Sequence, residues 1–490
     1  MFAGTGSDVG KSIIATAFCR IFRQDGYNPA PFKAQNMALN SFATPDGFEI
    51  GRAQAVQAEA AGVPCHTDMN PLLLKPQSDH TSQVVLNGRP IGNRNAYDYF
   101  RKEGREELRQ EVNAAFDRLS QRYNPVVMEG AGSLAEINLR DTDLVNIPMA
   151  KHAAADVILV GDIDRGGVFA SIYGSLMLLE PQERRLVKGI IINKFRGDIR
   201  QFDPGVKMLE ELCGIPVLGV LPYFKDIHIE EEDSVSLASK SLKAEQGMIN
   251  IAVVLLRHLS NFTDFNVLER DSRVHLFYSN NPDELSKADI IVIPGSKSTI
   301  DDMHELWRNG AARAILKAHR NGSTVLGICG GYQMMGQQIL DPLHVEGDVE
   351  MLPGLGLLPT VTEMGREKVT RQVKFSLCGR SGVMKGYEIH MGTTREASGS
   401  AEARPLNRLE DGTQEGFIVS PTCMGTYIHG ILDNKEFIDF LLEPHLQKTK
   451  EVEAFDYHKF KEQQYDRLAE HVRKHLNIPL IYDILTGDYD

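Results

Sequence analysis

The sequence predicts an α/β protein with two parallel-sheet domains and a helical C-terminal tail. Short runs of β-branched, apolar residues alternate with longer amphipathic stretches along the chain, which is typical of parallel α/β folds. The runs lack alternating polar residues, as expected of strands that are buried on both faces. A polar stretch rich in serine and charge, 230–248, separates the runs into two series and is interpreted as a linker.

The first series defines a predicted domain of residues 1–229. Its clearest strands are expected at 124–132, 156–164, 189–195 and 215–222. Helices are expected between strands, for example at Gly51–Gly62 and Gln182–Val187.

The second series defines a predicted domain of residues 249–443. Its strands are expected at 249–256, 289–295, 323–329 and 424–430. The remainder, 444–490, has the pattern of a charged helix and carries no chemistry that we identify. At about 150 residues per domain, the chain is long enough for roughly three domains. Two catalytic domains and a helical tail are consistent with that length.

The composition excludes several classes of protein. The chain has 53 Lys and Arg against 66 Asp and Glu, a net charge of −13, whereas nucleic-acid and anionic-membrane surfaces need clustered positive charge. No apolar run approaches the roughly 20 residues that span a bilayer, and no secretory signal is visible. The six cysteines are scattered without a C-x-x-C pair, which indicates reduced thiols in a cytoplasmic protein. We therefore expect neither nucleic acid nor a membrane as a partner.

A glycine-rich segment near the N-terminus predicts a phosphate-binding loop. Residues 4–12 read GTGSDVGKS and precede an apolar helical stretch, so backbone N–H groups and the helix dipole would point at a phosphate. We expect Lys11 to reach the β- and γ-phosphates of ATP and the Ser12 hydroxyl to bind Mg²⁺, with Thr5 and Gly10 in the loop. Thr5 stands where the G-x-x-x-x-G-K-[ST] pattern has glycine. Only Met1–Ala3 precede the loop, which leaves open a very short first strand or a true start upstream.

Two residues at predicted strand ends fit the same site. Glu129 ends the run PVVMEGAGS, where a second carboxylate would meet Mg²⁺, although a surface glutamate is the alternative. Asn193 follows another strand, where its amide can bind a purine edge or simply cap the next segment. Asp162 and Asp164 suit a metal or a solvated strand end equally well.

The segment GICGGYQ, 327–333, predicts a cysteine nucleophile on a strand-to-helix turn. Glycines on both sides of Cys329 allow a strained turn that exposes the thiol, and the following helix N-terminus favours the thiolate. His429 ends a later strand and is the expected general base. The N–H groups of Gly295 and Gly330 are expected to form an oxyanion hole.

The pattern G-x-C-x-G-x-Q with a distant histidine resembles class I glutamine amidotransferase domains. The resemblance implies a flavodoxin-like fold, glutamine hydrolysis through a cysteinyl thioester, and a glutamine-binding role for Gln333 beside Gly295 and Gly330. The usual third catalytic residue, a glutamate two positions after the histidine, is replaced by Ile431. The cobyrinate-amidating branch also lacks that glutamate, so the residue that orients His429 is left open.

The first half resembles the dethiobiotin synthetase group of phosphate-loop enzymes, which share the loop spacing and the EGAG glutamate. Longer strings resemble the cobyric acid synthase family over essentially the whole chain. They are FKAQNMALNS (32–41), EIGRAQAVQAEA (49–60), NPLLLKP (70–76), EINLRDTDLVN (136–146), DIDRGGVFA (162–170), INKFRGD (192–198) and KGYEIHMG (385–392).

That resemblance implies ATP- and glutamine-dependent amidation of the b, d, e and g carboxylates of adenosylcobyrinic acid a,c-diamide. ATP, Mg²⁺, L-glutamine and the corrinoid would be the cofactors and substrates, and the oligomeric state is left open. Asp141, in a matching string, is implied as a candidate for the carboxylate-activation site. A polyanionic substrate needs local cations, and the candidates inside the matching strings are Lys33, Arg52, Lys75 and Arg140.

Three alternatives are weighed against this interpretation. The a,c-diamide synthase of the same pathway shares both domains but is not expected to carry FKAQNMALNS or EIGRAQ. A partitioning-type ATPase would need a lysine where this chain has Gly6, and would leave the cysteine motif unexplained. A binding protein with an inactive amidotransferase module is disfavoured by the presence of both Cys329 and His429.

Overall fold

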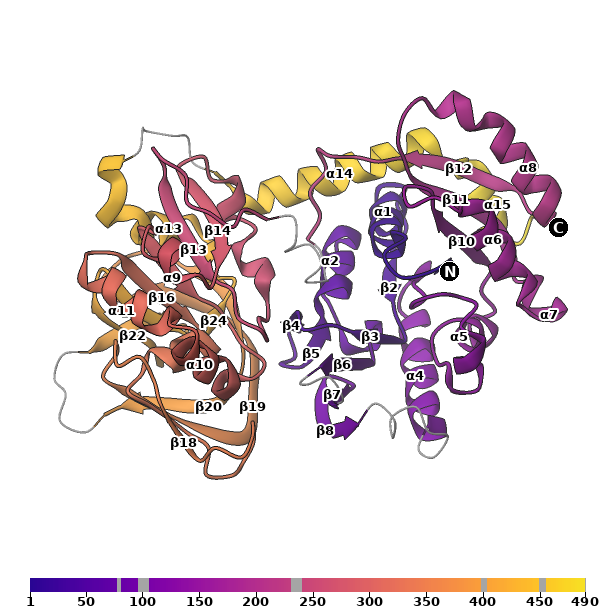
Figure 1. The fold of residues 1–490 in the computed structure, drawn as a ribbon. Helices are drawn as coiled ribbons and strands as arrows, with labels where there is room; N and C mark the ends of the chain where they lie inside the picture. Colours follow the sequence, from indigo (N-terminus) through magenta and orange to yellow (C-terminus); the bar gives the residue numbers. More distant parts are fainter. Residues whose placement is uncertain (77–80, 96–104, 231–239, 398–402, 449–454, 490) are drawn as a thin grey trace. The chain divides into compact units, whose positions relative to one another are not determined.

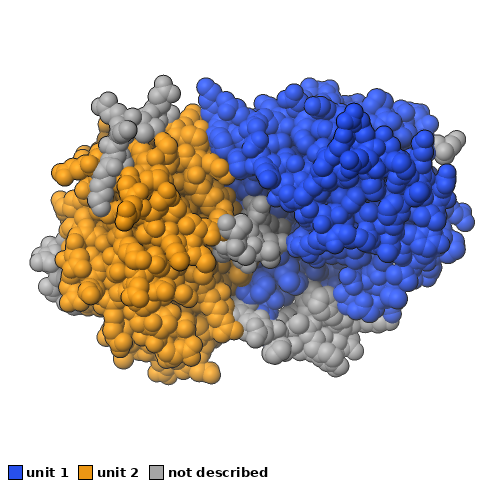
Figure 2. All heavy atoms as spheres, turned by 45° about the horizontal axis from the view of Figure 1, so that its top comes forward, with its two compact units in different colours: residues 1–38, 50–230, 459–490 blue, residues 39–49, 231–458 orange. Residues whose placement is uncertain are grey.

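The computed structural model describes residues 1–76, 81–95, 105–230, 240–397, 403–448 and 455–489 (Figure 1). The chain divides into two compact units, which are coloured separately in Figure 2. Unit 1 comprises Met1–Ala38, Ile50–Glu230 and Lys459–Asp490, and unit 2 comprises Leu39–Glu49 and Glu231–His458. The first half thus gives a short segment to unit 2, and the C-terminal helices belong to unit 1. The division expected from the sequence contains neither exchange.

Unit 1 is built on a parallel sheet of short, buried strands. The strands of unit 1 are β1 (Phe2–Gly4), β2 (Ala30–Phe32), β3 (Gln35–Met37), β6 (Leu72–Pro76), β7 (Thr81–Leu86), β8 (Arg89–Asn95), β9 (Val126–Met128), β10 (Val157–Asp162), β11 (Val187–Phe195) and β12 (Val217–Pro222). The order is β1-β10-β11-β12, all parallel, and a bridge from Phe2 to Glu129 links β1 to the parallel pair β2-β9. The mixed sheet β3-β6-β7-β8 is separate.

Helices cover both faces of the parallel sheet. They are α1 (Lys11–Gln24), α2 (Arg52–Ala61), α4 (Arg105–Ser120), α5 (Ile147–His152), α6 (Val168–Met177), α7 (Pro181–Arg184), α8 (Asp203–Cys213), α14 (Tyr457–His475) and α15 (Ile478–Thr486). Successive residues of β10 point to opposite faces, as strand geometry requires: Val160 packs with α1, α14 and α15, whereas Leu159 packs with α5, α6 and α8. The parallel α/β fold is therefore confirmed for this half.

The C-terminal helices complete the core on the α1 face. Tyr465, Leu468 and Val472 of α14 lie in one apolar cluster with Phe18 and Phe22 of α1. At the edge of this contact Arg20 Nε donates to Asp466 Oδ1 at 2.7 Å. The charged tail predicted from the sequence is helical, and its apolar side closes the core under the phosphate-loop helix.

Unit 2 contains a twelve-stranded mixed sheet. The strands of unit 2 are β4 (Ser41–Ala43), β13 (Ile249–Val254), β14 (Val274–Ser279), β15 (Ile290–Ile293), β16 (Thr324–Ile328), β17 (Gln338–Leu340), β18 (Met351–Pro353), β19 (Thr360–Leu377), β20 (Met384–Glu396), β21 (Arg404–Leu409), β22 (Gln414–Ser420), β23 (Cys423–Thr426) and β24 (Ile428–His429). The strand β5 (Glu49–Gly51) pairs with β4 and leads the chain back into unit 1.

The parallel part of this sheet positions the cysteine motif. Strands run in the order β14-β13-β15-β16-β23, all parallel, before an antiparallel extension that includes the long β19 and β20. The helices of unit 2 are α9 (Pro282–Leu285), α10 (Thr299–Arg308), α11 (Ala311–Arg320), α12 (Gly330–Met335) and α13 (Lys435–Leu442). Because β16 lies inside the parallel sheet, its carboxyl end opens where ligands bind in such folds.

One helix expected from the sequence is shorter than its predicted range. The expected helix Gln182–Val187 is only α7, which ends at Arg184, and Val187 begins the buried strand β11. Apolar periodicity over six residues does not separate a short helix from a strand end. Within the described ranges, no helix combines the length and apolarity that crossing a bilayer requires.

Candidate functional site

The phosphate loop lies between β1 and α1. At one position of the loop the backbone has a conformation that only glycine adopts readily. Gly10 caps α1 with a φ of 98°. A Cβ atom on Gly10 would lie 2.1 Å from Asn193 Nδ2, so the asparagine closes directly on the loop. Asn193 Nδ2 donates to the Val9 carbonyl at 2.9 Å. The sequence predicts Asn193 in this site, and in the structure its side chain lies beside the loop and is hydrogen-bonded to it.

Lys11 folds back over the loop. Its Nζ donates to the carbonyl oxygen of Gly6 at 2.8 Å and to that of Gly132 at 3.1 Å. Thr5 follows β1, and its N–H donates to the Val160 carbonyl at 3.0 Å. The ammonium therefore lies inside the concave turn, where backbone N–H groups at the start of α1 favour a phosphate.

Glu129 is the centre of a buried polar cluster beside the loop. Its Oε1 accepts from Ser12 Oγ at 2.7 Å and from Lys33 Nζ at 2.9 Å, and its Oε2 accepts from Gln57 Nε2 at 2.8 Å. Burial opposes the charge of Glu129, but the Lys33 ammonium and the donated hydrogen bonds hold the pKa of Glu129 below its ordinary value. Ser12 and Glu129 thus present oxygen atoms, one of them anionic, of the kind that Mg²⁺ prefers.

The cluster includes residues whose contribution the sequence did not reveal. Lys33, expected to contact substrate, forms an ion pair with Glu129, and its contact with substrate stays a prediction. Gln57 was not singled out, although it lies in a string that carries the family resemblance. Asp162, the last residue of β10, accepts from Lys194 Nζ at 2.9 Å, and Asp164, in the turn that follows, pairs with Arg196 at 2.5 Å. Both carboxylates are therefore partners of cations.

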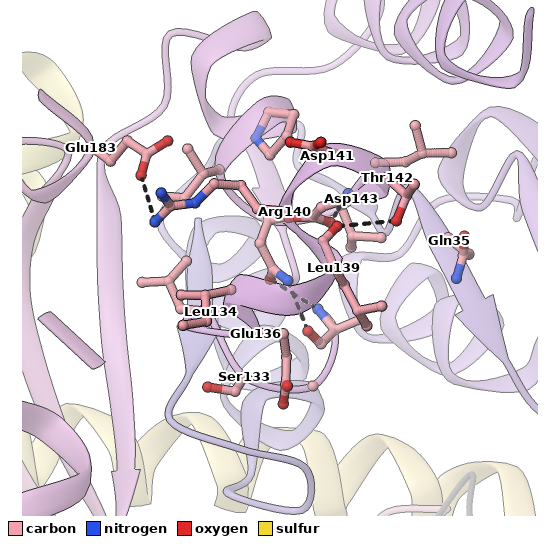
Figure 3. Close-up of a pocket in the computed structure, with 18 of the residues that line it drawn as sticks. Gln35, Ser133, Leu134, Glu136, Leu139, Arg140, Asp141, Thr142, Asp143 and Glu183 are labelled. Carbon is pink, nitrogen blue, oxygen red and sulfur yellow. Dashed lines mark hydrogen bonds and ion pairs between the residues drawn. The ribbon is translucent and has the colours of Figure 1, made fainter. Parts of the chain in front are cut away.

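Unit 1 contains a pocket of about 540 Å³ (Figure 3). Its wall includes Gly132, the residue whose carbonyl accepts from Lys11, and Gln35 of β3. Asp141 and Arg140 also line it, from the 3-10 helix η2 (Ile137–Thr142). A pocket adjoining the phosphate loop, with a carboxylate and a guanidinium in its wall, has room for part of a carboxylate-bearing ligand.

The four cations expected to hold substrate are dispersed within unit 1. Arg140 lines the pocket, where its Nη1 lies 3.1 Å from Glu180 Oε1. Arg52 Nε donates to Glu230 Oε2 at 2.8 Å, and Lys75 is buried on β6. Of these four cations, only Arg140 is among the described residues that line the pocket.

Cys329 occupies a strained turn between β16 and α12. Its φ of 53° and ψ of −111° lie outside the regions that side chains normally adopt, as at a nucleophile elbow. The flanking glycines are required sterically: a Cβ on Gly331 would lie 1.9 Å from the Ile293 carbonyl oxygen. Cys329 Sγ lies 3.5 Å from the Ile389 carbonyl oxygen, to which it donates. The strained turn that the sequence predicts is thus present, but the thiol is buried and not exposed as predicted.

His429 is oriented by a residue that the sequence did not identify. Its Nδ1 lies 2.7 Å from Asp264 Oδ2, and both side chains are buried. The other oxygen of Asp264 accepts from the Gly430 N–H at 3.1 Å, which fixes the carboxylate. Burial lowers the basicity of the imidazole, but Asp264 and the sulfur of Cys329 more than offset it and raise the pKa of His429 to about 10.

Gly295 and Gln333 lie around this pair. A Cβ on Gly295 would lie 3.1 Å from Ser260 Oγ and 3.2 Å from His429 Cε1, so Gly295 forms the wall next to the imidazole. A Cβ on Gly330 would lie 2.8 Å from the Ser296 nitrogen, which places the two predicted oxyanion-hole segments side by side. Gln333 Nε2 donates to the Met391 carbonyl at 2.8 Å, and Gln333 Oε1 accepts from Thr299 Oγ1 at 3.2 Å.

Comparisons with known proteins agree with both halves of the molecule. Residues 1–237 match the CobQ/CobB/MinD/ParA nucleotide binding domain, and residues 250–437 match the CobB/CobQ-like glutamine amidotransferase domain.

Curated relatives match the chain over nearly its full length. The chain is 74% identical to the cobyric acid synthase of Bacteroides fragilis, covering 100% of this chain and 98% of that protein. It is 56% identical to that of Parabacteroides distasonis and 47% identical to that of Citrobacter koseri, each over 99% of this chain and 98% of the relative. A nucleotide-binding half and an amidotransferase half, joined in one polypeptide of this length, place the chain in the cobyric acid synthase family.

Proposed function

We propose that the chain uses ATP and glutamine to amidate the b, d, e and g carboxylates of adenosylcobyrinic acid a,c-diamide. The observation that carries the proposal is the presence of a Cys329–His429–Asp264 arrangement in unit 2 and of a phosphate loop with Glu129 in unit 1. One arrangement suits ammonia release, and the other suits activation of the acceptor. Full-length similarity to cobyric acid synthases supports the choice of acceptor.

In unit 2, the sulfur of Cys329 attacks the side-chain amide of glutamine. The negative oxygen that develops on that carbon is stabilised by the N–H groups of Gly295 and Gly330. His429 Nε2 takes the proton of the Cys329 thiol, and Asp264, which accepts from Nδ1, stabilises the resulting imidazolium. Nε2 then gives that proton to the departing nitrogen, so that ammonia leaves and a thioester remains. Water, deprotonated by His429, then hydrolyses the thioester to glutamate and frees the thiol.

In unit 1, a carboxylate of the corrinoid attacks the γ-phosphorus of ATP, releasing ADP and forming an acyl phosphate. The start of α1 and Lys11 hold the phosphates and stabilise the charge that shifts to the leaving group. Ser12 and Glu129 are the residues that would hold Mg²⁺, which neutralises phosphate charge when bound. Lys33 keeps Glu129 ionised and oriented. Ammonia then attacks the acyl carbon and displaces phosphate.

Asp141 and Arg140 are proposed to act on the acceptor, because they line the pocket beside the phosphate loop. Arg140 would neutralise a peripheral carboxylate, and Asp141 would position the one being activated. Arg52 and Lys75 are proposed as further cations for the corrinoid.

All six cysteines are free, which agrees with a cytoplasmic location.

The a,c-diamide synthase of the same pathway is the nearest alternative. Mass analysis of the diamide incubated with ATP, Mg²⁺ and glutamine separates the two. We expect four successive products, each lighter than the previous one by the difference between OH and NH₂. An enzyme that leaves the a,c-diamide unchanged, yet amidates the fully carboxylated precursor twice, would contradict the proposal.

The division of labour is tested with Cys329→Ala. Loss of the thiol should abolish glutamine hydrolysis and glutamine-dependent amidation, whereas ammonium chloride should restore ATP-dependent amidation. Unchanged glutamine hydrolysis in this variant would overturn the assignment of the nucleophile.

A further inference from the structure

The segment Leu39–Glu49, here named the strap, belongs to unit 2 although it lies in the first half of the chain (Figure 2). The chain leaves unit 1 after Ala38, forms β4 and part of β5 in unit 2, and returns at Ile50. The amidotransferase family match, residues 250–437, does not include it. The glutaminase unit is therefore completed by residues from outside its own family domain.

The strap binds the turn that carries Asp264. Asn40 Oδ1 accepts from the Phe262 N–H at 3.2 Å, and Asn261 Oδ1 accepts from the Ser41 N–H at 3.0 Å. Asn261 has a left-handed φ of 52° and begins the 3-10 helix η5 (Phe262–Phe265). A non-glycine residue in this region needs support from its surroundings. The hydrogen bonds of Asn261 and Phe262 with Ser41 and Asn40 give that support two to three residues before Asp264.

The strap also packs on residues that contact His429 and Cys329. The ring of Phe42 lies 4.6 Å from that of Tyr387, and the Tyr387 ring stacks on His429 with centroids 5.3 Å apart. Ala43 shares an apolar cluster with Tyr387 and Ile389, and the Ile389 carbonyl accepts from Cys329 Sγ. Each of the three catalytic candidates thus has a neighbour that the strap touches.

Buried polar contacts fix the strap itself. Ser41 Oγ donates to Glu49 Oε1 at 2.7 Å, and Glu49 forms an ion pair with Lys368 of β19 in which both side chains are buried. Gln372 Nε2 of β19 donates to the Ala43 carbonyl at 3.0 Å. The ion pair favours one position of the strap, because a shifted arrangement would leave a buried charge unpaired.

We propose that the strap is a positioning element for glutamine hydrolysis. Asn40 and Ser41 hold the turn that carries Asp264 in position, and Phe42 holds the Tyr387 ring against His429. These residues do not touch glutamine; they act through Asp264 and His429. The proposal rests on the glutaminase role of those two residues. It assigns part of the glutaminase site to residues that precede the amidotransferase domain by about two hundred positions.

The test uses the full-length protein with Asn40→Ala, Phe42→Ala and, as a control, Asp46→Asn at the exposed tip of the strap. For the first two variants we expect the glutaminase kcat to fall by about tenfold or more with little change in the KM for glutamine, because small misplacements of catalytic groups cost rate. Ammonia-dependent amidation, which needs only unit 1, should equal that of wild type. Asp46→Asn should equal wild type in both assays.

Two results would overturn the proposal: an unchanged glutaminase kcat in Asn40→Ala and Phe42→Ala, or an equal fall in glutaminase and ammonia-dependent rates, which would mean general damage. Phe42→Leu, which keeps part of the packing, should restore kcat partly; no difference between Leu and Ala at this position would also count against it. If wild type failed to amidate with ammonia, the proposed function would fail, while the glutaminase kcat would still decide the role of the strap.

Discussion

His429 Nδ1 and Asp264 Oδ2 lie 2.7 Å apart in the interior of unit 2, and this pair completes the proposed catalytic arrangement with Cys329. The position two residues after the histidine, where related domains carry a glutamate, holds Ile431, which is fully buried. The carboxylate comes instead from a 3-10 turn far upstream. The histidine of this chain is therefore held by a carboxylate from a different part of the sequence.

Asp264→Asn should reduce the glutaminase kcat by about 10²–10⁴-fold, because the amide no longer holds the imidazole in the required tautomer. Ammonia-dependent amidation should be retained. The comparison is made by measuring glutamate release and amidated corrinoid in the same preparation. Equal glutaminase rates in the variant and wild type would mean that Asp264 does not orient His429.

The same ion pair should make the stability of unit 2 depend on pH. Asp264 and Cys329 raise the pKa of His429 from 6.5 to about 10 despite its burial. Because the folded state binds this proton more tightly, the stabilisation is complete below about pH 6.5 and is lost as the pH rises through about 10. Urea unfolding of wild type should therefore show a lower free energy of unfolding at pH 10 than at pH 7. Asp264→Asn should show a weaker dependence over that range, and an identical slope in both proteins would contradict the coupling.

Gly10→Ala should abolish ATP binding without unfolding the protein. The added Cβ would lie 2.1 Å from Asn193 Nδ2, and a φ of 98° is unfavourable for alanine. Calorimetric titration with ATP and Mg²⁺ measures the loss. The matched control is Gly174→Ala in α6, where a Cβ meets nothing within 4 Å and φ is not positive. This control should bind ATP as wild type does and gain about 0.5–1 kcal/mol of stability from the higher helix propensity of alanine.

Leu468→Ala should lower the free energy of unfolding of unit 1 by about 2–5 kcal/mol, the usual cost of a cavity at a fully buried leucine. Leu468 lies on α14 in the cluster that includes Phe18 of α1. Denaturant unfolding measures the change, and Glu470→Ala on the exposed side of the same helix is the control. A change within about 0.5 kcal/mol for Leu468→Ala would mean that the C-terminal helix does not support the core under the phosphate loop.

Much of the fold was predictable because the buried strands are plain in the sequence. The runs at 156–164, 189–195 and 249–256 became β10, β11 and β13, since a strand buried on both faces must be apolar at successive positions. The long strands β19 and β20 gave no such signal: many of their residues are polar or charged, and parts of them are exposed. Their pairing depends on partners distant in sequence.

The candidate site was predictable where chemistry is local and was not where it depends on tertiary contacts. The turn around Cys329 and the loop before Lys11 are short patterns whose glycines meet backbone at close range. Asp264 lies 165 residues from His429 in the sequence, in a segment with no motif of its own. The contact between the two residues is therefore visible only in the folded structure. The ion pair of Lys33 with Glu129 was likewise not predictable, because a sequence does not show that Glu129 Oε1 lies 2.9 Å from the Lys33 ammonium.

The most direct test of the account follows nitrogen from glutamine to the corrinoid. The full-length enzyme is incubated with adenosylcobyrinic acid a,c-diamide, ATP, Mg²⁺ and glutamine labelled with nitrogen-15 in the side-chain amide, and the product is analysed by mass spectrometry. The account predicts four new amides, all labelled, and no labelled product when Cys329→Ala replaces wild type. Product that lacks the label, or labelled product made by Cys329→Ala, would contradict it.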